Sequence, residues 1–315
     1  MTRLLIVFVI TFFSQFVNAN NKIDMSAQEA KSVVQNIAFA LDKIYLYPER
    51  AKYISQNLRM DSHKDQIKYS YNIEQFRNEM RSELVKATLD TAIDVVEERE
   101  GIDVSTDHLE LTNYTNASLD AEVSDNNIGY FKITGSADSI EVSDSILDAL
   151  QTLSAVDALI IDLRLSESAE LTLVQELISY FLPKGTLLGN MKTNNKTIQL
   201  FSEHTIAKNK FNNKVPLFII NSSFVSGEWE FFSHVLQQLN RAVVLGENTM
   251  GIAHLTKSVK VGDNIILKLP YAVVTGPLAD NSWDETGISP DYFTPNDKAI
   301  KKAYDLAVSQ ITNQL

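Results

Sequence analysis

Residues 215–231 read VPLFIINSSFVSGEWEF, and this stretch decides the fold class. An apolar run of strand length ends at Asn221 and two serines, and apolar residues such as Phe231 and Val235 then recur at helical spacing. This pattern predicts a buried strand, a short turn and a helix, which together form a unit of an α/β domain. The turn delivers Ser226 to the start of the helix.

Ser226 has two interpretations at this position. The first turn of a helix carries unpaired backbone N–H groups and the positive end of the helix dipole, so it can stabilise a serine alkoxide and the oxyanion of a substrate. Serine is also a common N-cap residue that only satisfies the end of a helix. The stretch alone therefore supports both a nucleophile and a structural cap.

Length and composition point to an exported globular protein. A chain of 315 residues with 44% hydrophobic content can bury one or two cores. Residues 1–19 have a basic start, an apolar run and a small-residue end, which predicts a secretory signal peptide. No later run approaches the roughly 20 apolar residues of a membrane span. We therefore expect a periplasmic or secreted protein with no membrane insertion after signal cleavage.

Charge and residue usage argue against disulfides, a lipid anchor, a nucleic-acid partner and a bound metal or cofactor. The chain has no cysteine, so it has neither disulfides nor the acylated cysteine of a lipoprotein. Its net charge of −12 argues against nucleic acid, which needs clustered lysine and arginine. No glycine pattern suited to phosphate is present, and the histidines lack the spacing of a zinc site; they are His63, His108, His204, His234 and His254. We expect no metal and no cofactor, and the oligomeric state stays open.

The periodicity of apolar residues along the chain changes near residue 101. Before it, residues 20–100 show helical periodicity, with a capping box at Ser26 and Glu29 and a restart at Pro48, which predicts a small helical bundle. Residues 101–127 are polar and predict a linker. Residues 128–315 alternate between strands and helices, typical of an α/β domain. Further strands are expected at 128–134, 158–163 and 242–246, an extended region at 264–275, and helices at 142–153, 171–182 and 295–311.

Six segments, taken in chain order, resemble those of the tail-specific, or C-terminal-processing, serine peptidases. They are residues 127–133, 160–164, 179–181, 225–231, 246–251 and 283–291. The resemblance is strongest to the branch related to interphotoreceptor retinoid-binding protein. It implies an N-terminal helical bundle followed by a crotonase-like domain of repeated strand-strand-helix units, acting on a peptide or protein substrate.

The resemblance also implies roles for individual residues. Ser226 matches the nucleophile of the family, and the N–H of Gly227 matches an oxyanion donor. Ser168 falls in the turn that supplies the other oxyanion amides. Asp284 falls where members with a Ser-His-Glu arrangement place the acidic residue. An aspartate three residues before Gly287 is also an ordinary turn residue, so a structural role for Asp284 stays open.

The general base departs from the family pattern. Relatives with a Ser-Lys dyad have lysine where this chain has Ile252, which cannot accept a proton. Relatives with a catalytic histidine have an Asp-x-His-Leu motif, but the segment around Asp90 has Ala92 at the histidine position. A nearby Asp-His-Leu sequence supplies His108 instead, and His254 is the weaker alternative. The base is therefore His108, His254 or none.

Two hypotheses follow from these departures. In one, the protein is a serine endopeptidase with Ser226, His108 and Asp284 as its catalytic residues. In the other, it is a degenerate peptidase that binds a peptide or an apolar small ligand in the former cleft. The second gains support from residues 166–169, where Cβ-bearing residues replace the usual glycine pair and resist its backbone conformations.

Overall fold

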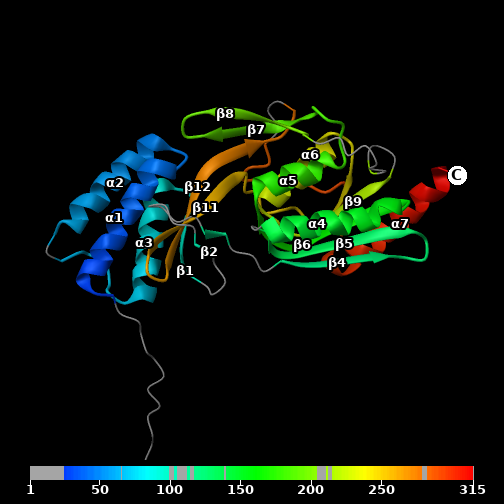
Figure 1. Cartoon of the computed structure of the whole chain (residues 1–315). Coiled ribbons are helices and arrows are strands. Elements are labelled where there is room, and N and C mark those ends of the chain that lie inside the picture. The colour runs from blue at the N-terminus through cyan, green and yellow to red at the C-terminus, as the bar shows by residue number, and fades with distance from the viewer. Residues whose placement is uncertain are drawn as a thin grey trace, which may run out of the picture.

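The computed structural model describes residues 25–64, 66–98, 103–104, 112–113, 117–137, 140–203, 211, 215–278 and 282–314. Helices α1 (Ala27–Ile44), α2 (Pro48–Ser62) and α3 (Ile73–Thr88) form a unit at one end of the molecule, and the sheet-rich part follows (Figure 1). The chain is thus a mixed α/β protein whose helical unit precedes its sheets.

Local signals start each of the first three helices, and the first two start where the sequence predicts them. Ser26 Oγ accepts a hydrogen bond from the Glu29 N–H at 3.2 Å, and Glu29 Oε2 accepts one from the Ser26 N–H at 2.6 Å. This confirms the capping box. Pro48 occupies the first position of α2, and Asn72 caps α3 by accepting from the N–H of Gln75.

The main sheet contains six strands in the order β13-β10-β9-β6-β5-β4. Its members are β4 (Ser118–Val123), β5 (Ile128–Ala137), β6 (Ala158–Ala169), β9 (Leu217–Asn221), β10 (Val243–Gly246) and β13 (Tyr292–Phe293). Strand β4 pairs antiparallel with β5, and the other neighbours pair in parallel. The strands predicted at 128–134, 158–163 and 242–246 are confirmed.

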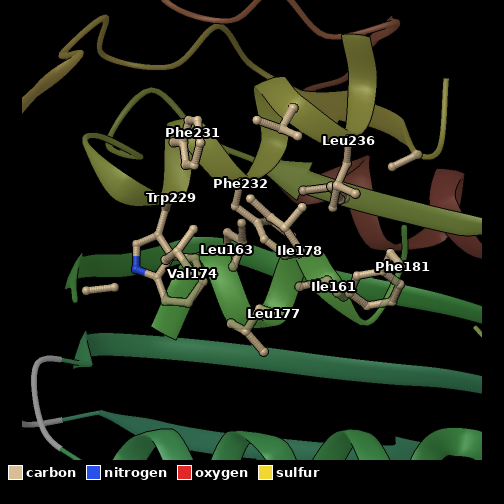
Figure 2. Packing of buried hydrophobic residues seen from close by; sticks show 14 of the residues in the cluster. Ile161, Leu163, Val174, Leu177, Ile178, Phe181, Trp229, Phe231, Phe232 and Leu236 are labelled. Carbon is tan, nitrogen blue, oxygen red and sulfur yellow. The ribbon is translucent and has the colours of Figure 1, made fainter. Parts of the chain in front are cut away.

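Helices cover both faces of the main sheet. Because side chains alternate along a strand, Ile161 and Leu163 of β6 enter one core and Ala158 and Ile160 enter the other. The first core contains α4 (Ile140–Thr152), α5 (Leu171–Ser179) and α6 (Glu228–Gln238), and Figure 2 shows the side chains of α5 and α6 packed over β6. The second core is closed by an alanine stripe of α7 (Asn296–Gln314), namely Ala299, Ala303 and Ala307.

A second sheet connects the two parts of the molecule. Its strands are β1 (Asp94–Glu97), β7 (Leu187–Thr193), β8 (Thr197–Phe201), β11 (His254–Gly262) and β12 (Ile265–Thr275). They lie in the order β1-β12-β7-β8, with β11 also paired to β12. Only the region of β12 is expected from the sequence; the β7–β8 hairpin and β11 are additional, and so is β1, which lies within residues 20–100, where only helices are expected. The short strands β2 (Asp103–Val104) and β3 (Thr112–Asn113) pair with each other.

The β11–β12 hairpin contributes to two cores. Its distal half joins the helical unit through Val259, Val261, Ile265, Leu267 and Leu269. Its other half joins the α/β core through Leu255, Ala272 and Val274. The side-chain amide of Asn36 donates to the Val261 carbonyl at 2.9 Å, and the Leu46 N–H donates to the Pro270 carbonyl at 3.0 Å. Figure 1 shows the hairpin running between the two parts. The helical unit is therefore held by a segment from much later in the chain.

The signal peptide expected at 1–19 lies outside the described residues, as do residues 101–102, 105–111 and 114–116 of the linker expected at 101–127. Both assignments stay predictions. Within the described part of the chain, no helix is long and apolar enough to cross a membrane.

We expect Gly262→Ala to destabilise the protein at the contact between α1 and the hairpin. A Cβ on Gly262 would lie 2.4 Å from Cγ2 of Val33, a buried β-branched side chain with little rotamer freedom. The cost of such overpacking is about 1–3 kcal/mol in the free energy of unfolding, measured by urea denaturation. Val33→Ala makes room, so the double variant should lose less than the sum of the single losses. Additive losses would contradict the contact.

Candidate active site

Ser226 lies in the connection between β9 and α6. Backbone hydrogen bonds fix this segment beside residues 250–252: the Met250 N–H donates to the Val225 carbonyl at 3.0 Å, and the Gly227 N–H donates to the Ile252 carbonyl at 3.2 Å. Val225 and Gly227 are buried, whereas Ser226 between them is half-buried. Among the described residues, no hydrogen bond engages the Ser226 hydroxyl. The serine is therefore held at an accessible position with its hydroxyl available.

Ile252 and His254 lie on the accessible face of the segment that borders Ser226. Gly251, Ala253 and Leu255 are buried, and the two residues between them are half-buried. This alternation is that of an extended chain, in which residues two apart face the same side. The imidazole of His254 and the side chain at position 252 thus point to the same side of the segment.

The buried carboxylate of Glu230 organises this arrangement. It accepts hydrogen bonds from the N–H groups of Gly251 at 2.7 Å, Ile252 at 2.8 Å and Gly227 at 3.1 Å, and a fourth from the hydroxyl of Thr249. Burial raises the pKa of Glu230, while these four hydrogen bonds favour the charged form. Because its partners come from both segments, one side chain fixes the Ser226 turn to residues 249–252.

Two glycine turns bring Asp284 to the same place. Gly251 has a φ of 85° and Gly287 a φ of 73°, and a Cβ on either residue would meet backbone atoms of the other turn. The Glu285 N–H donates to the Gly251 carbonyl at 2.8 Å, and the Ile288 N–H donates to Thr249 Oγ1 at 2.8 Å. The segments 246–251 and 283–291 therefore pack directly on each other.

Asp284 faces His254. Its Oδ1 atom accepts a hydrogen bond from the Ala253 N–H at 3.1 Å and lies 3.6 Å from Nδ1 of His254, beyond hydrogen-bond distance. On the other side of the ring, Nε2 of His254 lies 3.1 Å from the hydroxyl of Tyr47, in the connection between α1 and α2. The structure thus aligns a carboxylate, an imidazole and a phenol beside the Ser226 turn.

The structure places the other predicted site residues as follows. His108 lies outside the described residues, so its role stays a prediction. Ser168 does not lie in a turn: residues 166–169 continue β6, which pairs with β5 up to Ala137 and Ala169. The turn expected there is wrong, because the strand extends past its apolar part. The Gly227 N–H already has two protein acceptors, Glu230 and Ile252, and could serve an oxyanion only by exchanging them.

Asp162 and Arg164 have structural partners at the middle of β6. The buried Asp162 carboxylate accepts from the Tyr130 hydroxyl at 2.7 Å and forms an ion pair with the Arg164 guanidinium at 2.7 Å. Arg164 also donates to the Asn296 carbonyl at the start of α7. The Tyr130 and Arg164 contacts supply donors to a buried carboxylate and join the sheet to α7.

No group of three metal-ligating side chains with suitable geometry occurs among the described residues. The Ser226 turn is bordered by the segment that carries the His254 imidazole, and Asp284 lies beside that imidazole. A hydroxyl with a neighbouring imidazole–carboxylate pair is suited to nucleophilic catalysis.

Comparisons with known proteins show what the sequence and the fold are similar to. The sequence matches the model of peptidase family S41 over residues 127–294, a span that includes Ser226, His254 and Asp284. The structure is similar to that of a photosystem II D1 C-terminal processing protease, with a TM-score of 0.56 and 12% identity over 84% of this chain and 93% of that chain.

Two further solved structures share the fold. A lipoprotein from Streptococcus agalactiae has a TM-score of 0.63 and 13% identity, over 90% of this chain and 97% of that chain. A putative peptidase from Parabacteroides merdae has a TM-score of 0.53 and 12% identity, over 90% of this chain and 97% of that chain. At these identities the likeness concerns the fold alone.

We expect Glu230→Gln to loosen the site and lower stability. An amide cannot accept from all four donors, and its own NH₂ group faces N–H groups, so the free energy of unfolding should fall by about 2–3 kcal/mol. Glu228→Gln is the matched control, because Glu228 lies in the first turn of the same helix and is half-buried; its loss should stay below about 1 kcal/mol. Chemical denaturation measures both. Equal losses would show that Glu230 acts only through the helix dipole.

Proposed function

Because the chain belongs to peptidase family S41, we propose that it hydrolyses peptide bonds with Ser226 as the nucleophile. The observation that carries this proposal is the grouping of Ser226, His254 and Asp284 around residues 250–254. Each of the three comes from a different part of the chain. A peptide or protein is the substrate class that the family implies.

In this proposal His254 is the general base. Ser226 Oγ attacks the carbonyl carbon of the peptide bond and gives its proton to Nε2 of His254. His254 then passes that proton to the leaving amine, and the acyl group stays on the serine until water hydrolyses it. Asp284 faces Nδ1, where a carboxylate holds the ring orientation and stabilises the imidazolium. The 3.6 Å separation must shorten when substrate binds, as is common for catalytic groups without substrate.

The position of His254 favours it over His108 as the base. It lies two residues after Ile252, on the same accessible side of the segment, and its ring nitrogen faces Asp284. Relatives of the Ser-Lys type place their basic group at position 252. We infer that the basic side chain has moved along the same face in this chain.

The finer features expected from the sequence form part of the proposal. We infer an exported, periplasmic or secreted enzyme, on the signal-like residues 1–19. We also infer a crotonase-like domain, supported by the alternation of strands and helices from β5 to β10. Gly227 remains the proposed oxyanion donor, with its N–H released from Ile252 and Glu230 when substrate binds.

A degenerate peptidase that binds a peptide or an apolar ligand is the second candidate. The observation that favours it is the Gly227 N–H, which is buried and has two protein acceptors. If that N–H never turns to the substrate, the oxyanion loses a donor that is usually worth a factor of about 10²–10³ in rate.

A fluorophosphonate probe, which reacts with activated serines, tests the proposed function. We expect the purified protein to be labelled at Ser226, with the site located by mass spectrometry. Ser226→Ala should abolish labelling, and Ser223→Ala, an exposed serine of the same turn, should retain it. Absence of labelling in the unsubstituted protein would support the binding candidate instead.

The same assay identifies the base. His254→Gln should slow the labelling of Ser226 by about 10²–10⁴-fold, the usual contribution of a general base, and Asp284→Asn should slow it as well. His108→Gln should leave the rate unchanged. If instead His108→Gln slows labelling and His254→Gln does not, the base is His108.

A further inference from the structure

Tyr47 contacts the catalytic side of His254. It is the residue before Pro48, at the N-terminus of α2, where its side chain forms no capping hydrogen bond. Its hydroxyl instead lies 3.1 Å from Nε2 of His254, the ring nitrogen that faces away from Asp284. A residue of the helical unit thus contacts the nitrogen to which the proposed function assigns proton transfer.

The chemistry of the ring determines which way this hydrogen bond runs. A neutral imidazole carries its proton on one nitrogen and a lone pair on the other. A carboxylate only accepts hydrogen bonds, so Asp284 favours the form with the proton on Nδ1. Nε2 then carries the lone pair, and the Tyr47 hydroxyl donates to it. This lone pair is the one that must receive the proton of Ser226.

The surroundings of Tyr47 keep its hydroxyl protonated and in place. Partial burial raises the pKa of Tyr47, the negative charges of Asp90 and Asp284 raise it further, and Arg50 opposes them. The Arg50 guanidinium lies 4.9 Å from the centre of the Tyr47 ring, and the Tyr45 ring packs against it edge-on at 5.6 Å. The phenol is therefore a hydrogen-bond donor, held by contacts that do not involve its hydroxyl.

Tyr47 is also accessible to an arriving substrate. Its relative exposure is 36%, against 16% for the side chain of His254. The N–H of the adjacent Leu46 donates a hydrogen bond to the carbonyl of Pro270 in the β11–β12 hairpin, which also carries His254. The contact between Tyr47 and His254 is thus set by the docking of the helical unit on the hairpin.

We propose that Tyr47 is a latch on the catalytic base: its hydroxyl occupies Nε2 of His254 in the free protein and must leave before that nitrogen can take the proton of Ser226. This inference rests on the proposed function. Tyr47 acts only through His254 and touches no reacting atom, so it is a positioning residue and not a catalytic one. A substrate that enters beside the α1–α2 connection releases the latch by displacing the hydroxyl.

Tyr47→Phe tests the latch, because it keeps the ring contacts with Tyr45 and Arg50 and removes only the hydroxyl. We expect the fluorophosphonate to label Ser226 about three- to tenfold faster in this variant, the change that corresponds to the net strength of one neutral hydrogen bond. Tyr53→Phe is the matched control, since Tyr53 lies on α2 and is 68% exposed; its labelling rate should equal that of the unsubstituted protein.

A spectroscopic measurement separates a latch from a general change in structure. In ¹⁵N NMR of histidine-labelled protein, the Nε2 resonance of His254 should move in Tyr47→Phe and stay in place in Tyr53→Phe, because only the first substitution removes its donor. His254→Gln assigns the resonance. An unchanged Nε2 resonance would overturn the contact and the latch with it.

The labelling outcomes distinguish the two inferences. If Ser226 is labelled but Tyr47→Phe reacts at the same rate or more slowly, the latch is wrong and the nucleophile stands. If Ser226 is labelled in neither protein, the proposed function fails, and the latch fails with it. Faster labelling with a moved Nε2 resonance supports both.

Discussion

The burial of one hairpin in two cores is the constraint on which the rest of the structure depends. Strands β11 and β12 give apolar side chains to the helical unit at one end and to the α/β core at the other. At roughly 25 cal/mol for each Å² of apolar surface removed from water, neither half of the hairpin can leave its core without a large loss. The relative position of the two parts is thereby fixed, and with it the contact of Tyr47 with His254, which begins β11.

Within that frame, Glu230 determines the local geometry of the candidate site. A buried carboxylate is costly unless donors surround it, and the four donors to Glu230 come from the Ser226 turn and from residues 249–252. The side chain therefore requires these two segments to lie together. The close approach of Gly251 and Gly287 then leaves Asp284 only one place, beside Ala253 and His254. The buried Glu230 carboxylate and the two glycine turns therefore bring together the segments that carry Ser226, His254 and Asp284.

The sequence predicts those parts of the fold that local signals specify. The capping box at Ser26, the restart at Pro48 and the apolar run before Asn221 each determine an element within a few residues, and each appears in the structure. The β7–β8 hairpin and β11 lack such signals, because their burial is irregular along the strand and depends on partners far away in the chain. The extension of β6 to Ala169 likewise cannot be predicted from the local sequence, since it follows from pairing with β5.

In the candidate site, too, some residues can be predicted from the local sequence and others only from contacts between distant segments. Ser226 is apparent in the sequence because a strand-turn-helix unit positions it, and Asp284 because a recognisable segment contains it. Preference for His108 over His254 rests on similarity to an Asp-x-His-Leu motif, which says nothing about which carboxylate the ring meets. The distance from His254 to Asp284 is set by the two glycine turns, one near each residue in sequence, and by Glu230, which is far in sequence from both. The proposal that the base lies at His254 therefore depends on contacts that form only when the two turns are folded together. Because the Tyr47 hydroxyl contacts the same imidazole, the proposed control of the base comes from the helical unit, which also packs on the hairpin.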